Sequence, residues 1–280
     1  MKQQSIIFTV DVEDWYQVEN LREVIGRHIW EEQRARVEDN TFKLLDLLDD
    51  CNGKATFFIL GYIAQRHSKL VKKIYERGHE IANHGFNHEL IYNQSHEAFE
   101  DDIKDSKDLL EDIIGEAVIG YRAPAFSITD WALDILKKCG YIYDSSVFPF
   151  GVHGRYGKLK TPLWPFHRGI AKFENGLLEV PLPMLKIANR TIPWAGGGYF
   201  RLIPYVLFRI GIKRILIKNS IFTFYIHPWE IDWLQPRIKG IKLQYKLRHY
   251  VNLGSTYKKL STLAQDFRLQ SIKEFIKEKL

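Results

Sequence analysis

Short apolar runs alternate with amphipathic stretches through the first 150 residues. Five runs have the length and the β-branched or aromatic content of buried strands, and they lie at residues 5–10, 54–60, 79–84, 117–124 and 141–147. The stretches between them carry apolar residues at helical spacing, and predict helices at 37–53, 61–78, 95–115 and 129–140. This alternation predicts an α/β protein with parallel strands and helical crossovers, as an open sheet or a barrel.

The pattern changes after residue 150. Residues 151–220 are rich in glycine, proline and aromatic residues, which is typical of elaborate loops. Strands are predicted again at 177–183 and 220–232, and a basic tail from Lys239 is predicted to be helical from Thr256. We therefore expect a main domain of residues 1–238 that includes a loop-rich insert at 151–220, followed by a basic, largely helical C-terminal extension at 239–280.

Composition narrows the class of protein. The chain has 280 residues, of which 45% are hydrophobic and 26% charged, so it can bury a large core. Two cysteines are too few for a disulfide framework. The first apolar run is too short for a signal peptide, and no stretch has the length of a membrane span. A cytoplasmic protein without a transmembrane segment is the expectation.

The net charge of +6 comes mainly from the last third of the chain. Such a region can contact nucleic acid, an anionic membrane surface or an acidic glycan, or it can be a solvated lysine-rich face. No nucleic-acid motif accompanies the charge, so we expect no nucleic-acid partner.

Three carboxylates follow the first predicted strand within four residues: Asp11, Glu13 and Asp14. They repel one another unless a cation offsets their charge. His84 and His88 are four residues apart, a spacing that places both imidazoles on one face of a helical turn. One carboxylate would complete a two-histidine, one-carboxylate set for a divalent metal ion. We favour Asp14 as that ligand and keep Glu13 as the alternative.

Several other polar and aromatic residues are candidates for a site. Asp11, the two histidines and Arg122 follow different strands, and the carboxyl ends of parallel strands share one rim. Asp144 is a further rim candidate, or the cap of a turn. The loop aromatics are either sugar-stacking platforms or core residues, and Arg201 is a candidate for binding an acidic group. The substrate-binding candidates are thus Ala125, Asp144, Trp194, Tyr199, Arg201 and Trp229.

Four motifs in this order resemble a known family: TVDVED at 9–14, HGFNH at 84–88, RAPAF at 122–126 and FYIHPWE at 224–230. Together they resemble the polysaccharide deacetylases with a NodB-type domain, the carbohydrate esterase family 4 type. GGGYFRLIP at 196–204 extends the resemblance to the branch that has an additional C-terminal region and is found with bacterial exopolysaccharide and surface-glycan synthesis.

The resemblance implies a distorted barrel of about seven β/α units that removes acetyl groups from N-acetylated sugars with a divalent metal ion. It implies that Asp11 is the general base, oriented by Arg122, and that His227 is the general acid. An acid just after Asp11 would bind the metal with the two histidines, and the backbone at Ala125 would help to bind the oxyanion. The family motif has two adjacent aspartates, whereas Val12 and Glu13 separate Asp11 from Asp14 here.

The expected cofactor is one divalent ion, with zinc preferred and cobalt, manganese, iron or nickel as alternatives. The expected substrate is an N-acetylated sugar in a polysaccharide or in a lipid-linked glycan at the inner membrane surface, where the protein would be peripheral. Three other functions stay open: hydrolysis of another C–N amide such as a cyclic imide or ureide, glycan binding without catalysis, and glycoside hydrolysis. The last leaves the histidine pair without a role.

Overall fold

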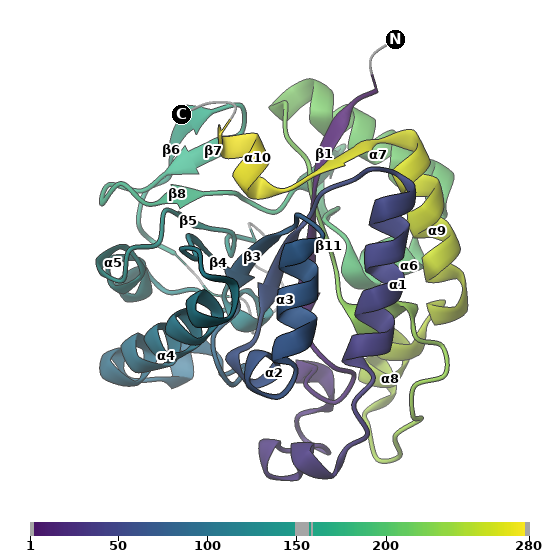
Figure 1. Ribbon diagram of the computed structural model, residues 1–280. Helices are drawn as coiled ribbons and strands as arrows, with labels where there is room; N and C mark the ends of the chain where they lie inside the picture. The colour runs from purple at the N-terminus through teal and green to yellow at the C-terminus, as the bar shows by residue number, and fades with distance from the viewer. Residues whose placement is uncertain (1–2, 149–156, 158, 278–280) are drawn as a thin grey trace.

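The computed structural model describes residues 3–148, 157 and 159–277, and a curved sheet lies at its centre (Figure 1). The sheet has the strand order β11-β1-β2-β3-β4-β5-β8-β7-β6. All pairs from β11 to β8 are parallel, and β7 and β6 add to β8 as antiparallel strands. The strands are β1 (Ser5–Val12), β2 (Thr56–Ile59), β3 (Glu80–Asn83), β4 (Gly120–Tyr121), β5 (Tyr143–Asp144), β6 (Trp164–His167), β7 (Ile170–Lys172), β8 (Leu178–Glu179) and β11 (Thr223–Ile226).

Each strand predicted from an apolar run is present, so the expected α/β fold is confirmed. The crossovers are α1 (Val37–Asp50), α2 (Gly61–Arg66), α3 (Ser68–Glu76), α4 (His96–Ile114) and α5 (Asp130–Lys138). The helix predicted at 61–78 is two helices, because the backbone leaves the helical region at His67, with φ −129° and ψ 43°. Short 3-10 turns lie at Glu19–Leu21, Arg27–Glu32, Ile91–Asn93, Pro124–Phe126 and Pro228–Ile231.

The prediction of a loop-rich insert at 151–220 is wrong for the residues of this range that the structure describes. That part contains β6 to β8, a hairpin of β9 (Met184–Ile187) and β10 (Arg190–Pro193), and the helices α6 (Gly197–Leu202) and α7 (Tyr205–Asn219). Gly211 lies inside α7 and does not end the helix. It faces the indole of Trp194, and a Cβ at this position would lie 2.2 Å from Nε1 of the indole. Glycine there is a packing requirement rather than a loop signal.

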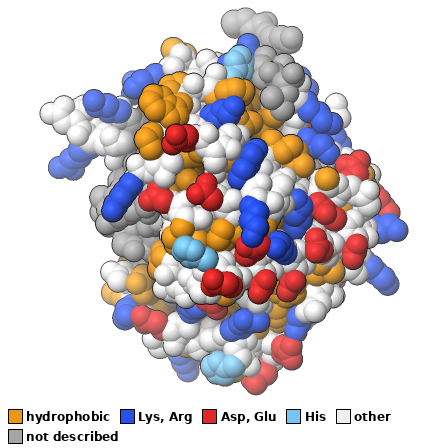
Figure 2. All heavy atoms as spheres, turned by 90° about the vertical axis from the view of Figure 1, so that its left-hand side faces the viewer, with side chains coloured by type: hydrophobic (Ala, Val, Ile, Leu, Met, Phe, Trp, Pro, Cys, Tyr) orange, Lys and Arg blue, Asp and Glu red, His pale blue; other side chains and the backbone are white. Residues whose placement is uncertain are grey.

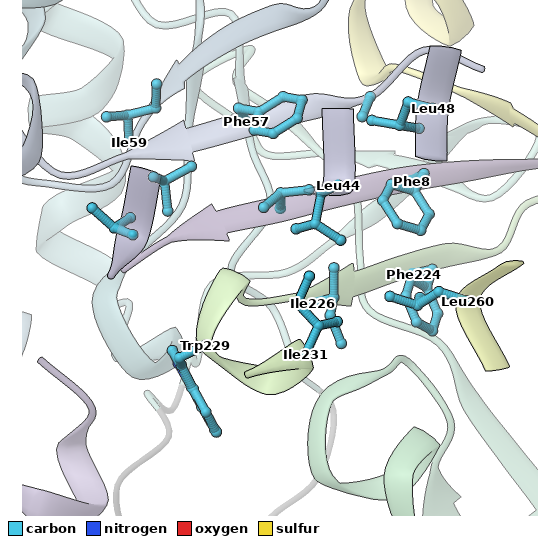
Figure 3. Close-up of a cluster of buried hydrophobic side chains, with 14 of the residues drawn as sticks. Phe8, Leu44, Leu48, Phe57, Ile59, Phe224, Ile226, Trp229, Ile231 and Leu260 are labelled. Atoms are coloured by element: carbon cyan, nitrogen blue, oxygen red, sulfur yellow. The ribbon is translucent and has the colours of Figure 1, made fainter. Parts of the chain in front are cut away.

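β1 pairs with three other strands of the sheet: β11, β12 (Arg268–Gln270) and β2. It pairs with β11 over Ile7–Val10 on one side, and with β2 over Thr9–Val12 on the other. The rings of Phe8 and Phe224 stack across the first pair with centroids 5.3 Å apart (Figure 3). This apolar packing fixes the height at which β1 and β11 end, and therefore where the polar residues after them emerge.

The C-terminal extension is mostly helical, with α8 (Leu243–Tyr250), α9 (Leu253–Asp266) and α10 (Ile272–Lys277). It also contributes β12 (Arg268–Gln270), which pairs with β1 over Ser5–Ile7. The extension therefore completes the same sheet, and a domain boundary at residue 238 stays a prediction. Among the described residues, no helix is both long and apolar enough to cross a membrane.

Candidate metal and catalytic site

The candidate metal-binding and catalytic residues at the ends of several strands lie at one pocket, as the sequence predicts. Asp11 lies near the end of β1, His84 directly follows β3, and His227 directly follows β11. All three line a pocket together with Glu13 and His88. Arg122, which follows β4, lies beneath this pocket with no exposed surface and contacts Asp11.

Glu13, His84 and His88 form a buried cluster whose ligand atoms lie within 4.8 Å of one another. Oε1 of Glu13 is 3.1 Å from Nε2 of His84 and 3.0 Å from Nε2 of His88. Burial raises the pKa of Glu13, but the imidazoles of His88 and His227 outweigh this, and the pKa lies well below its usual range. An ionised carboxylate and two imidazoles are the donor set that a divalent transition metal prefers.

The orientation of His84 fits metal binding. Its Nδ1 lies 2.7 Å from the carbonyl oxygen of Arg122. A proton on Nδ1 donated to that carbonyl leaves the lone pair of Nε2 facing Glu13. Such second hydrogen bonds are a regular feature of metal-binding histidines, because they fix both tautomer and ring orientation.

The two histidines converge through a loop and not through the helical turn used to predict them. Residues 84–88 are outside any helix, and the backbone is left-handed at Gly85 (φ 74°) and at His88 (φ 54°). The N-terminus of α2 holds this loop, since Gly61 N donates to Gly85 O and Tyr62 N to Phe86 O, both at 2.9 Å. The histidine pair was predicted correctly, but the geometry behind the prediction was wrong.

Asp14, the favoured metal ligand, lies outside the cluster, and this prediction is corrected in favour of Glu13. Its Oδ2 accepts hydrogen bonds from the backbone N–H groups of Arg36 (2.7 Å) and Val37 (3.0 Å), and its Oδ1 from Trp15 N (2.8 Å). Asp14 therefore satisfies the N–H groups at the start of α1. Burial raises its pKa to about 6 against the lowering effect of these bonds.

Asp11 is held by Arg122. Nη1 of Arg122 donates to Oδ1 of Asp11 at 2.6 Å and to Oγ1 of Thr9 at 2.8 Å. Its Nε and Nη2 donate to the carbonyl and hydroxyl oxygens of Ser145 at 3.0 and 2.9 Å. With these groups occupied, the guanidinium has one fixed position. Oδ2 of Asp11 is left facing His227, whose Nε2 is 3.9 Å away.

His227 is supported by a chain of buried charges that the sequence analysis missed. Its Nδ1 lies 2.8 Å from Oε1 of Glu230, and Oε2 of Glu230 accepts from Nε of Arg201 at 2.7 Å. Burial lowers the pKa of His227, but the carboxylates of Glu13, Glu230 and Asp11 raise it to about 9. These carboxylates therefore favour the protonated imidazole. The sequence signal for the pairing of His227 with Glu230 is the HPWE motif, in which the acid follows the histidine by three residues.

Arg201 does not bind substrate as predicted. It borders the pocket, but its side chain is buried and donates to the backbone oxygens of Arg248, His249 and Val251 as well as to Glu230. These bonds occupy the guanidinium and tie α6 to the end of α8. Arg201 supports Glu230, and through it His227.

Two further predicted substrate contacts are also corrected. The indole of Trp194 is buried, donates to Phe208 O at 2.9 Å and stacks on the Phe208 ring. Asp144 is fully buried and accepts from the hydroxyl of Ser146 at 2.6 Å. Asp144 has no exposed surface and Trp194 very little, so both side chains pack within the fold and are not available to a substrate.

Tyr199, Trp229 and Ala125 do line the pocket. Trp229 is mostly covered, however, because its ring lies between the imidazoles of His227 and His249. Ala125 has a left-handed backbone, with φ 49° and ψ 25°, in the turn at Pro124–Phe126. A left-handed backbone is strained for alanine and needs support from its surroundings. Here it places the peptide groups of the turn at the pocket.

Two family models match successive parts of the chain. Residues 29–143 match the polysaccharide deacetylase model, and residues 145–277 match a domain of unknown function, DUF3473. His84, His88 and Arg122 lie in the first part, whereas His227 and its supporting residues lie in the second. Both parts are thus needed for the site described above.

Two curated relatives agree with the match to the polysaccharide deacetylase model. The chain is 40% identical over 158 residues to a peptidoglycan-N-acetylglucosamine deacetylase of Bacillus cereus, covering 56% of this chain and 62% of that protein. It is 32% identical to a peptidoglycan deacetylase of Helicobacter pylori, covering 50% and 51%. The chain therefore spans little more than half the length of these relatives.

The fold resembles that of a Mycobacterium smegmatis protein described provisionally as a polysaccharide deacetylase. The TM-score is 0.62 at 18% identity, over 99% of this chain and 90% of the other. That likeness concerns the fold, including the C-terminal region. The chain carries a polysaccharide deacetylase domain, and the DUF3473 region follows it.

Proposed function

We propose that this protein is a metal-dependent hydrolase that removes N-acetyl groups from an N-acetylated sugar. One observation carries the proposal: the Asp11 carboxylate and the His227 imidazole face each other across the edge of the buried Glu–His–His cluster. Nε2 of His227 lies 3.9 Å from Oδ2 of Asp11 and 3.8 Å from Oε1 of Glu13. An amide hydrolase needs a base for the attacking water, an acid for the leaving amine and a means to stabilise the oxyanion, all within a few ångströms.

Each residue has one step to perform. Glu13, His84 and His88 would hold a divalent ion, which supplies Lewis-acid polarisation of the acetyl carbonyl and an acidified water. Asp11 accepts the proton of the attacking water, and Arg122 holds the Asp11 carboxylate in position through its Nη1 donor. His227, protonated at Nε2, donates to the departing sugar nitrogen, while Glu230 on Nδ1 stabilises the charge that His227 carries before this transfer. The backbone N–H of Ala125 stabilises the oxyanion, because the N–H groups of Phe126 and Ser127 already donate to the carbonyls of Ala123 and Pro124.

We assign the substrate to the surface glycans or their lipid-linked precursors, and zinc to the metal position. The activity in the name of the Bacillus cereus relative, a peptidoglycan-N-acetylglucosamine deacetylase, supports an N-acetylhexosamine, and the resemblance of GGGYFRLIP at 196–204 supports the exopolysaccharide branch. Two imidazoles and one carboxylate are a common ligand set of catalytic zinc. A cytoplasmic location at the inner membrane surface, where a lipid-linked precursor would be met, is part of the proposal.

The test is release of acetate from a panel of N-acetylated oligosaccharides by metal-loaded protein, with cyclic imides and ureides as competing substrates. We expect acetate from a glycan, loss of activity with a chelator, and loss in His84→Ala. His167→Ala is the matched control, because this histidine lies exposed on β6. Full acetate release by folded His84→Ala would overturn the proposal. Ring opening of a cyclic amide without any acetate release would favour the alternative hydrolase.

A further inference from the structure

The second half of the chain has an unusual distribution of charge. Residues 180–229 and 233–265 contain no aspartate or glutamate, although basic residues recur throughout both. The opposite side of the molecule differs. There α4 is strongly acidic, and the face with α4 and α5 shows acidic and basic side chains interspersed (Figures 1 and 2). The protein therefore has a positive side, formed by α6 to α9, and a more acidic one.

Large apolar side chains are exposed on the positive side. Leu243 and Leu247 follow each other by one turn on α8, with 71% and 62% of their surface exposed, and Trp233 is 61% exposed. On α6 and α7 the exposed apolar residues are Leu202, Val206, Leu207, Ile210 and Ile217. Isolated exposed leucines are ordinary, but a tryptophan and several leucines and isoleucines within two acid-free segments are not. The part of this set that lies together around α6 and α8, namely Leu202, Trp233, Leu243 and Leu247 with the lysines and arginines of residues 233–248, is called the apolar-basic surface below.

The apolar-basic surface adjoins the catalytic pocket. Leu202 of α6 and Gln244, Tyr245 and Arg248 of α8 line one groove, and this groove shares Tyr199 and Arg248 with the pocket that contains Asp11 and His227. The bonds from Arg201 to the backbone of α8 hold the two helices together at this point. A large partner seated on α6 and α8 would thus lie at the mouth of the pocket.

The lysines on this surface are available to such a partner. Within the part of the chain that the structure describes, neither Lys239 nor Lys246 forms an ion pair. Cations beside exposed leucine and tryptophan match the boundary between lipid headgroups and acyl chains, where tryptophan also concentrates. An acidic partner protein would account for the lysines alone, whereas a bilayer interface accounts for the lysines together with the exposed leucines and tryptophan.

We propose that the apolar-basic surface docks the protein on an anionic lipid bilayer, with the apolar side chains in the interface and the mouth of the pocket facing the headgroups. Because a few apolar side chains alone bind only weakly, the basic residues supply the second contribution that stable docking requires. The acidic α4 side then faces away from the membrane. This inference does not depend on the proposed deacetylation, since docking is measured without turnover.

The experiment is co-sedimentation of the full chain with vesicles of phosphatidylcholine, with and without phosphatidylglycerol. We expect binding only to the anionic vesicles, weakened by salt. Lys239→Glu/Lys246→Glu should bind at least about 25-fold more weakly, because each lysine near an anionic surface contributes about fivefold. Lys69→Glu/Lys72→Glu on α3 is the matched control, with the same change of charge at exposed positions, and should bind like the wild type.

A second pair separates the apolar contribution from charge. Leu243→Ser/Leu247→Ser should also lose vesicle binding, while it keeps the wild-type activity on a soluble oligosaccharide. Absence of wild-type binding to anionic vesicles, or equal loss in the α3 control, would overturn the proposal. A third outcome would also overturn the proposal: the wild type is a dimer in light scattering, Leu243→Ser/Leu247→Ser is a monomer, and vesicle binding is the same for both. The surface would then bind a second copy of the chain.

Discussion

The assignment of Glu13 rather than Asp14 as the metal ligand can be tested by replacing each carboxylate. Glu13→Gln removes the charged atom that lies 3.1 and 3.0 Å from the two imidazoles. Asp14→Ala instead removes the acceptor for three backbone N–H groups. We expect the first change to weaken metal binding with little effect on folding, and the second to reduce stability with metal binding retained.

The magnitudes follow from these contacts. Replacing a residue that only supports a metal ligand costs 10- to 100-fold in affinity, so losing the ligand itself should cost at least about 100-fold. Asp14→Ala leaves the buried N–H groups of Trp15 and Val37 without acceptors, at about 2 kcal/mol each. Burial of the ionised Asp14 is itself unfavourable, since a pKa moved from 3.8 to about 6 corresponds to about 3 kcal/mol. Removing that charge offsets most of the loss, and a net destabilisation of about 1 kcal/mol remains.

The assay is urea unfolding with and without zinc, together with metal content after dialysis. At a zinc concentration 100-fold above the wild-type Kd, bound metal adds about 2.7 kcal/mol to the free energy of unfolding. The same increment should occur in Asp14→Ala and shrink to about 0.4 kcal/mol in Glu13→Gln. If Asp14→Ala lost the zinc increment while Glu13→Gln kept it, the assignment of the ligand would be wrong.

Other predictions concern the buried charges. Arg122→Met leaves Asp11 buried without its partner, so we expect about 3–5 kcal/mol lower stability in urea unfolding and loss of acetate release; unchanged stability would contradict the ion pair. Glu230→Gln removes the negative charge at Nδ1 of His227, so the alkaline limb of the rate–pH profile should move to lower pH, and an unmoved limb would refute the coupling. Burial lowers the pKa of His79 to about 3, so the unfolded state binds the extra proton below pH 6.5. Stability should therefore fall between pH 6.5 and 3 by up to about 1.4 kcal/mol per pH unit, less so in His79→Leu, measured by urea unfolding at several pH values.

The sequence was sufficient to predict features that depend on local pattern. Apolar runs of strand length and helical periodicity located the first five strands, and parallel pairing then placed Asp11, His84 and Arg122 near one rim. In the second half, composition misled the prediction. Glycine and proline in residues 191–211 suggested loops, whereas they permit close packing around Trp194 and the start of α7.

The features that could not be predicted depend on contacts between distant residues. Whether Asp14 or Glu13 binds metal is decided by backbone N–H groups of Arg36 and Val37, 22 and 23 residues further along the chain. Arg201 looked like a free cation beside a glycine run, but three backbone oxygens near residue 250 occupy its guanidinium. Spacing along a sequence gives no information about such partners.

The pairing of β12 with β1 also has a consequence for biosynthesis. The strand that carries Asp11 is synthesised more than 200 residues before its neighbours β11 and β12. A nascent chain cannot complete the hydrogen bonding of β1 until translation has passed residue 270, and contacts this distant in sequence slow folding. Truncation within residues 268–277 should therefore trap an aggregation-prone intermediate with an open edge beside β1, rather than release a smaller active enzyme.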